Sequence, residues 1–131
     1  MPARVTWGEA GMIEVESERE LREALGRLCE LALTEGPFIA ELRLQNGDML
    51  GIGLGRPESV VAYLPGTGMP PYYHAESSGD HRLDQALTFD LAGETTEFPS
   101  SQAVPVERAK DALVHFFETG QLAPFLEWVE D

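Results

Sequence analysis

A chain of 131 residues that carries 23 acidic and only 9 basic side chains, for a net charge of -14, has the length of one domain, residues 1–131. So acidic a surface repels nucleic acid and anionic lipid and favours a basic protein partner, although the same charge also keeps a small protein soluble. One cysteine excludes a disulfide framework, and without a signal-peptide pattern or an apolar run of membrane-spanning length we expect a cytoplasmic protein with no membrane contact.

The first part of the chain predicts a short strand followed by an amphipathic helix. Residues 12–16 alternate weakly between apolar and polar side chains, which is typical of a strand. Ser17 and Glu20 have the spacing of a capping box, in which each side chain bonds a backbone N–H near the helix start. Leucines and alanines then recur every three or four residues, which predicts a helix over Glu18 to Leu33. Cys29 lies at the edge of this stripe, so we interpret it as a half-buried structural thiol.

A β-hairpin follows the first helix. Residues 38–45 alternate strictly, Asn46 and Gly47 form a favoured two-residue turn, and residues 49–54 return as the partner strand. Gly51 and Gly53 leave one face of that strand bare, and we expect the helices to approach the sheet closely there. The glycines do not indicate a phosphate-binding loop, because neither the Lys-Ser/Thr pair nor a helix follows them.

The middle of the chain predicts further strands. Residues 59–64 read as a third strand of the meander, and residues 72–76 as a short strand after a loop rich in proline and glycine. Residues 87–91 and 95–98 alternate on either side of a turn and predict a second hairpin. Residues 126–129 predict a last short strand near the end of the sequence.

A second helix is predicted over Pro105 to Thr119. Proline is tolerated in the first turn of a helix, where its missing N–H would have no partner. Gly120 fits a left-handed C-cap, and Phe116 and Phe117 supply a large apolar surface that a sheet must cover. The fold class predicted from these elements is α+β: a single antiparallel sheet of about five or six strands with two main helices packed on one face.

The last third of the chain carries an ordered set of residues that resembles a known family. The set is Gly93, Thr96-Glu97-Phe98-Pro99, Val104-Pro105-Val106-Glu107, Ala109, Ala112-Leu113, Phe116, Thr119-Gly120 and Trp128. It is similar to the C-terminal signature of immunity-protein family one of bacterial polymorphic toxin systems. The resemblance implies a small cytosolic protein that binds and neutralises a secreted toxin, commonly a nucleic-acid deaminase.

No constellation of residues in the sequence indicates catalysis, a metal or a cofactor, and we predict that the protein is not an enzyme. His74-Ala75-Glu76 has the H-x-E form found in zinc deaminases, but the P-C-x-x-C that must accompany it is absent. His74, Asp80, His81 and Asp84 occur in one polar stretch and could gather around a cation, although a solvated loop is the simpler interpretation.

The segment around residues 72–84 is the predicted partner-binding site. Tyrosine is enriched at binding hot spots, and neighbouring carboxylates would form an acidic rim suited to a basic cleft. The predicted binding residues are Tyr72, Tyr73, His74, Glu76, Asp80 and Asp84. Packing of one of the two tyrosines on the sheet is an equally good interpretation. Glu127, Glu130 and Asp131 form an alternative acidic surface.

The sequence thus predicts a protein that inhibits a toxin by binding it and occluding a basic cleft. The alternative, from another class, is a small acidic secretion chaperone that binds an effector segment. Neither the toxin's target nor the oligomeric state can be read from these residues.

Overall fold

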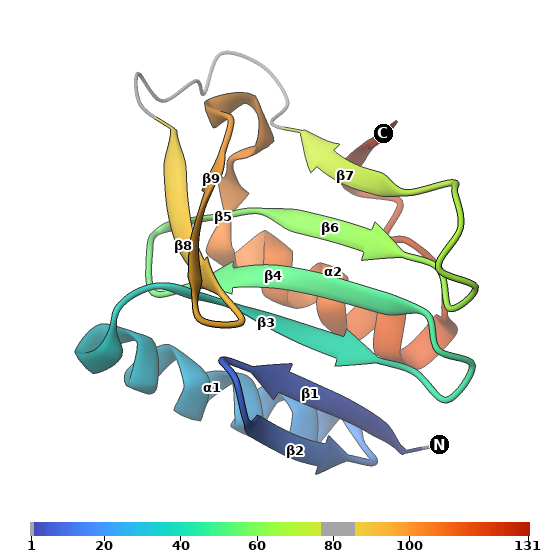
Figure 1. Ribbon diagram of the computed structural model, residues 1–131. Helices are drawn as coiled ribbons and strands as arrows, with labels where there is room; N and C mark the ends of the chain where they lie inside the picture. Colours follow the sequence, from blue (N-terminus) through green and yellow to red (C-terminus); the bar gives the residue numbers. More distant parts are fainter. Residues whose placement is uncertain (1, 77–85) are drawn as a thin grey trace.

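The computed structural model describes residues 2–76 and 86–131 of the chain. Within these residues, nine strands form one sheet and two helices cover one of its faces (Figure 1). Seven strands follow one another across the sheet in the order β11 (Glu127–Glu130), β7 (Tyr73–Glu76), β6 (Val61–Leu64), β4 (Met49–Leu54), β3 (Phe38–Arg43), β1 (Ala3–Trp7) and β2 (Gly11–Val15). Each neighbouring pair on this path is antiparallel.

The remaining strands lie off this path. The hairpin of β8 (Leu87–Leu91) and β9 (Glu94–Phe98) joins the end of β3 through one parallel pairing and crosses in front of the sheet in Figure 1. Two short strands, β5 (Glu58–Ser59) and β10 (Val104–Pro105), pair with each other, and the 3₁₀ turn η1 (Ser100–Gln102) precedes β10. The β8–β9 hairpin lies on the face of the sheet opposite the helices, because its Phe89 ring packs over Gly53 of β4. We call this face the outer face.

Helix α1 (Glu18–Glu35) begins with the predicted capping box. The side chain of Ser17 accepts a hydrogen bond from the backbone N–H of Glu20 at 3.1 Å, and the Glu20 carboxylate accepts one from the N–H of Glu16 at 2.7 Å. These bonds satisfy N–H groups that have no partner inside the helix. The apolar stripe of α1 is buried against the sheet: Leu21, Ala24, Leu25, Leu28 and Ala32. Cys29 is half-buried at its edge, as the periodicity predicted.

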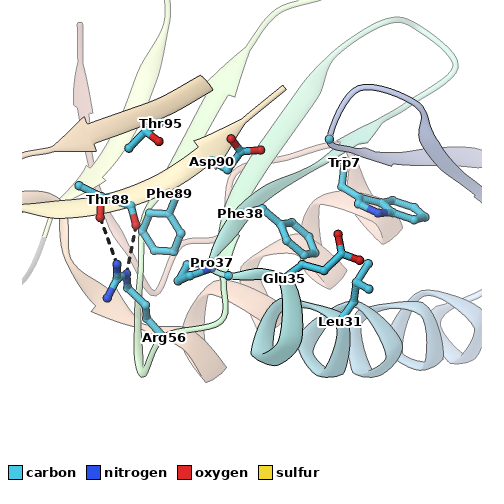
Figure 2. Close-up of a pocket in the computed structure, with 12 residues that line it drawn as sticks. Trp7, Leu31, Glu35, Pro37, Phe38, Arg56, Thr88, Phe89, Asp90 and Thr95 are labelled. Atoms are coloured by element: carbon cyan, nitrogen blue, oxygen red, sulfur yellow. Dashed lines mark hydrogen bonds between the residues drawn. The ribbon is translucent and has the colours of Figure 1, made fainter. Parts of the chain in front are cut away.

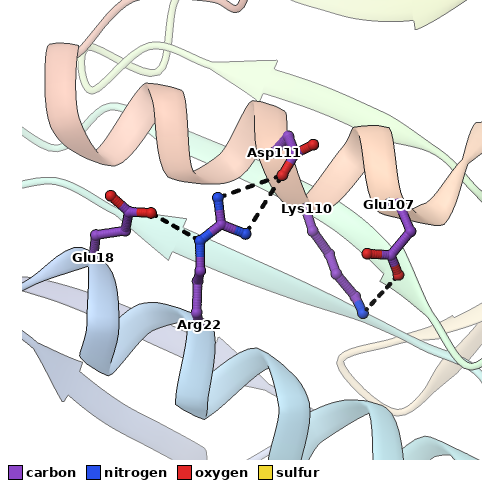
Figure 3. Close-up of polar contacts among 5 residues, drawn as sticks. All are labelled: Glu18, Arg22, Glu107, Lys110 and Asp111. Atoms are coloured by element: carbon purple, nitrogen blue, oxygen red, sulfur yellow. Dashed lines mark hydrogen bonds and ion pairs between the residues drawn. The ribbon is translucent and has the colours of Figure 1, made fainter.

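Helix α2 (Val106–Thr119) is held at both ends. The N–H of Val106 donates to the carbonyl of Pro57 at 2.9 Å, and Gly120 closes the helix in the left-handed conformation at φ 72°. At the surface, Arg22 of α1 bonds Glu18 at 2.9 Å and reaches Asp111 of α2 at 3.4 Å (Figure 3). Exposed ion pairs of this kind contribute little, so the apolar stripes of the two helices fix their position.

The outer face has a smaller core of its own under the β8–β9 hairpin. Its buried residues are Ile39, Val60, Leu87, Phe89 and Ala103. A Cβ added to Gly53 would come within 2.5 Å of the Phe89 ring, so the glycine makes room for that ring. The expectation that helices approach the bare glycine face was wrong. The helices pack on the opposite face, against Leu50, Ile52 and Leu54.

The α+β class and the position of both helices are confirmed, but the number of strands was predicted too low. Residues 3–7 form β1, which the sequence analysis did not assign although Ala3 and Val5 are buried at alternate positions. The β5–β10 pair also went unassigned, because strands of two residues are too short to show a period. Two-residue strands can be assigned only when the segment that pairs with them is known.

Replacing Gly53 with alanine is expected to lower the free energy of unfolding by about 1 to 3 kcal/mol, the usual cost of overpacking. The added methyl group would collide with the Phe89 ring. The matched control is Gly26→Ala, because a Cβ at this position in α1 meets nothing within 4 Å. That change is expected to raise the free energy of unfolding by about 0.5 to 1 kcal/mol, the difference in helix propensity. Urea midpoints check both, and equal destabilisation of the two variants would contradict the packing argument.

Candidate partner-binding site

The pairing of β7 with β11 brings two acidic segments of the sequence together. Glu127 lies directly opposite Glu76, and Glu130 lies opposite Tyr73. Asp131 continues the pairing, since its N–H donates to the carbonyl of Tyr72 at 2.8 Å. Glu76 and Glu127 are like charges on directly opposite strand positions and repel each other. We call Glu76, Glu127, Glu130 and Asp131 the acidic end of the sheet.

His74 links the two strands of the acidic end. Its Nε2 lies 3.0 Å from Oε2 of Glu76, and its Nδ1 contacts a carboxylate oxygen of Asp131. The His74 side chain is only 13% exposed. Burial alone would lower the pKa of His74, but the hydrogen bonds to Glu76 and Asp131 outweigh it and raise the pKa above its ordinary value of 6.5. The contacts of His74 with Glu76 and Asp131 therefore hold Asp131 against β7, and they are strongest when the ring is protonated.

The contribution of His74 to stability is expected to fall as pH rises. Because its folded-state pKa is raised, the stabilisation is fully present below pH 6.5, the ordinary value, and is lost as pH rises through the folded-state pKa. Urea unfolding of the wild type and His74→Gln between about pH 5.5 and 8.5 checks this. The two free energies should differ most at the acid end and converge at the alkaline end. A difference that stays constant with pH would show that the ring acts by packing alone.

The tyrosines beside the acidic end are partly committed to the fold. Tyr73 packs on Tyr63 with ring centroids 6.1 Å apart, and Tyr63 meets Phe116 of α2 edge-on at 6.0 Å. The Tyr72 hydroxyl donates to the carbonyl of Gly68 at 2.7 Å. Both Tyr72 and Tyr73 are half-buried. Each therefore leaves part of its ring exposed and uses the rest to fix the loop or the strand.

Four of the six residues predicted to bind a partner lie on β7 and the residue before it: Tyr72, Tyr73, His74 and Glu76. Successive strand residues face opposite sides, so His74 and Glu76 share the outer face, whereas Tyr73, which packs on Tyr63, lies on the helix side. Asp80 and Asp84, the other two, lie outside the described residues. The alternative acidic surface, Glu127 to Asp131, turns out to be continuous with Glu76. The sequence predicted a strand at 126–129 but gave no signal for its pairing partner.

The outer face next to the acidic end carries small and apolar side chains among the described residues. Ala62 of β6 lies opposite both Gly51 of β4 and His74 of β7, so two of these three neighbouring positions carry little or no side chain. Leu64 and Val129 are exposed at 40% and 38%. Exposed apolar side chains beside carboxylates resemble the centre and rim of a protein interface.

Further along the same outer face, Glu41 of β3 pairs with Gly51 and is half-buried. Burial raises the pKa of Glu41, while the charge of Arg43 opposes that shift. Sequence alternation placed Glu41 on this face, but nothing in the pattern predicted its burial. Glu41 therefore lies on the outer face with β4 and β6 between it and the acidic end.

Among the described residues, no group of three or more His, Cys, Asp or Glu side chains could hold a metal ion. None of the helices in the described part of the chain has the length and apolar character needed to cross a membrane.

The half-buried Trp128, part of the set of residues that suggested a family, donates its indole N–H to the carbonyl of Ala123 at 2.8 Å and packs against the helix-side core. The set as a whole therefore spans the β8–β9 hairpin, α2 and β11, and includes parts of both cores.

A comparison with protein families agrees with the resemblance that these residues suggested. The model of the family described as Immunity protein Imm1 matches residues 9–130. A comparison with curated proteins finds no match. The family match covers nearly all strands and both helices, from the turn after β1 to the end of β11. The chain therefore belongs to the Imm1 family of immunity proteins.

Proposed function

We propose that the protein binds a cognate toxin domain and neutralises it by occluding a basic cleft. Its membership of the immunity family, by a match over residues 9–130, is the observation that carries the proposal. The toxin class we propose is a nucleic-acid deaminase, the class that the resemblance to immunity-protein family one implies. An enzyme that holds nucleic acid presents positive charge around its substrate, which suits an acidic inhibitor. The protein acts by binding and performs no catalysis of its own.

The acidic end of the sheet is the surface we propose for this contact. Glu76, Glu127, Glu130 and Asp131 supply negative charge, and Leu64 and Val129 supply exposed apolar area beside it. Tyr72 and Tyr73 add aromatic rings that are already partly fixed, which reduces the entropy lost on binding. Opposite charge steers a basic toxin toward this end, and the apolar and aromatic groups then slow its release.

We place this action in the cytoplasm of the producing cell. Cys29, the single cysteine, is a free half-buried thiol, which fits a reducing compartment.

The test is co-expression with the toxin domain encoded beside this gene. Cells that express the toxin domain alone should stop growing, and cells that also express this protein should grow normally. The two purified proteins should form a stoichiometric complex in which the isolated toxin's activity is lost. Growth arrest that persists despite expression of the folded protein would overturn the proposal. A complex with an unfolded segment of the neighbouring protein, without inhibition, would instead identify a chaperone.

A further inference from the structure

A cleft of about 380 Å³ lies where the β8–β9 hairpin meets the C-terminal end of α1 (Figure 2). It is separated from the acidic end of the sheet by β4 and β6. Its walls come from the end of β1, the end of α1 and the hairpin, and include Trp7, Glu35, Phe38, Phe89 and Asp90. The volume is near the lower limit for small-ligand sites, so the cleft has room for one side chain or a small molecule.

The aromatic walls of the cleft are rigid. Phe38 and Phe89 are 6% and 1% exposed, and each is packed into one of the two cores. The indole of Trp7 lies over Gly11, where any added Cβ would collide with the ring. The three rings are therefore held in place before any ligand arrives, which lowers the entropic cost of binding.

The charged groups of the cleft favour a cation. Glu35 is exposed, and its carboxylate has no hydrogen bond or ion pair among the described residues. Asp90 accepts the N–H of Gly93 through Oδ2 at 3.2 Å, which leaves its other oxygen available. Figure 2 shows these two carboxylates on either side of Phe38. The negative end of the α1 dipole also lies here, and the last turn of α1 carries no basic residue.

The cation that lines the cleft, Arg56, is already committed elsewhere. Its Nε and Nη2 donate to the carbonyl and the hydroxyl of Thr88, both at 3.1 Å, and its guanidinium lies over the Phe89 ring at 5.8 Å. Arg56 therefore fixes the hairpin and leaves Glu35 and Asp90 without a cationic partner among the described residues.

We propose that this cleft binds the side chain of an arginine presented by a protein partner. A guanidinium is flat and weakly hydrated, so it stacks on aromatic rings such as Trp7 while its N–H groups bond carboxylates on either side. That the toxin supplies this arginine rests on the proposed function. The cleft then gives the toxin a second anchor point, remote from the acidic end of the sheet.

The direct test is an NMR titration of the ¹⁵N-labelled protein with N-acetyl-arginine-methylamide. The Trp7 indole N–H and the Gly36 amide should shift in a saturable way. The citrulline counterpart, which has the same shape without the charge, should bind at least tenfold more weakly, because it forms no charge-assisted bonds. Absence of a saturable shift, or equal shifts with citrulline, would overturn the proposal.

Substitutions of the two cleft carboxylates test whether arginine binds in this cleft. In the double variant Glu35→Gln and Asp90→Asn, arginine binding should weaken at least tenfold, whereas the amide introduced at position 90 keeps an oxygen for the Gly93 N–H. The matched control is Glu30→Gln with Glu97→Gln, which removes two exposed charges from the same helix and hairpin outside the cleft. The control should bind arginine as the wild type does. If both double variants lost arginine binding equally, arginine would not be bound by Glu35 and Asp90 in this cleft.

Toxin binding provides the second arm of the test. The cleft variant should raise the dissociation constant of the toxin complex at least tenfold, mainly through faster dissociation. If the toxin binds wild type and cleft variant equally, it does not supply the arginine and that part of the proposal fails. If the toxin does not bind the wild type at all, the proposed function fails, and the NMR titration still decides whether the cleft binds arginine.

Discussion

Replacing Phe116 with alanine is expected to lower the free energy of unfolding by about 3 to 5 kcal/mol, the range for removing a buried aromatic side chain. Phe116 is fully buried, with 0% of its surface exposed, in the core between α2 and the sheet. Its ring meets Tyr63 edge-on at 6.0 Å, so the substitution removes that contact as well as apolar burial. The urea midpoint should fall with no change in the slope of the transition.

Two control substitutions test whether any change in a helix lowers the free energy of unfolding, or only a change at a buried position. Leu33→Ala removes a side chain that is 78% exposed on α1, and it should change stability by less than about 0.5 kcal/mol. Phe117→Ala removes a half-buried ring next to Phe116 and should have an intermediate effect. A Phe116→Ala midpoint close to that of Leu33→Ala would show that this face of α2 is not core.

Because Tyr63 also contacts Tyr73 on β7, the substitution at Phe116 is expected to loosen the acidic end of the sheet. Tyr63 packs between Phe116 of α2 and Tyr73 of β7, so the packing of the helix-side core also holds Tyr73 in place.

The sequence predicted local features that depend on neighbours along the chain. The capping box at Ser17 and the C-cap at Gly120 are present, because each needs only a few adjacent residues. The hairpin turn lies where it was predicted, but its two-residue form was wrong: the N–H of Gly47 donates to the carbonyl of Leu44, and Gly47, not Asn46, has the positive φ, at 93°. Alternation also placed Ile39 and Glu41 correctly on the face opposite Ala40.

Features that depend on distant segments could not be predicted in this way. Nothing in residues 49–54 indicates that Phe89 fills the space over Gly53. The acidic end depends on the pairing of β11 with β7, two segments more than fifty positions apart in sequence. The sequence showed two separate acidic surfaces because register and pairing, which join them, leave no local signal.

Neutralising the acidic end is expected to slow association with the toxin at least tenfold at low salt. The variant carries Glu76→Gln, Glu127→Gln, Glu130→Gln and Asp131→Asn, which removes four charges from one end of the sheet. Steering by opposite charge accelerates encounter by about 10- to 1000-fold, and screening at physiological salt limits its reach to about 8 Å. The wild-type association rate should therefore fall steeply as salt rises, and the variant's rate should be slow and nearly flat.

The control variant removes the same number of charges from β2 and the helix side: Glu14→Gln, Glu16→Gln, Glu30→Gln and Glu118→Gln, all at exposed positions. Both variants lose four carboxylates, so a difference between them reports where the carboxylates lie. Stopped-flow mixing at several salt concentrations measures the rates. If the two variants associate equally slowly, net charge steers the toxin and the acidic end is not the docking surface. If the acidic-end variant alone is slow, the toxin approaches over β7 and β11, because local potential falls off within about one screening length.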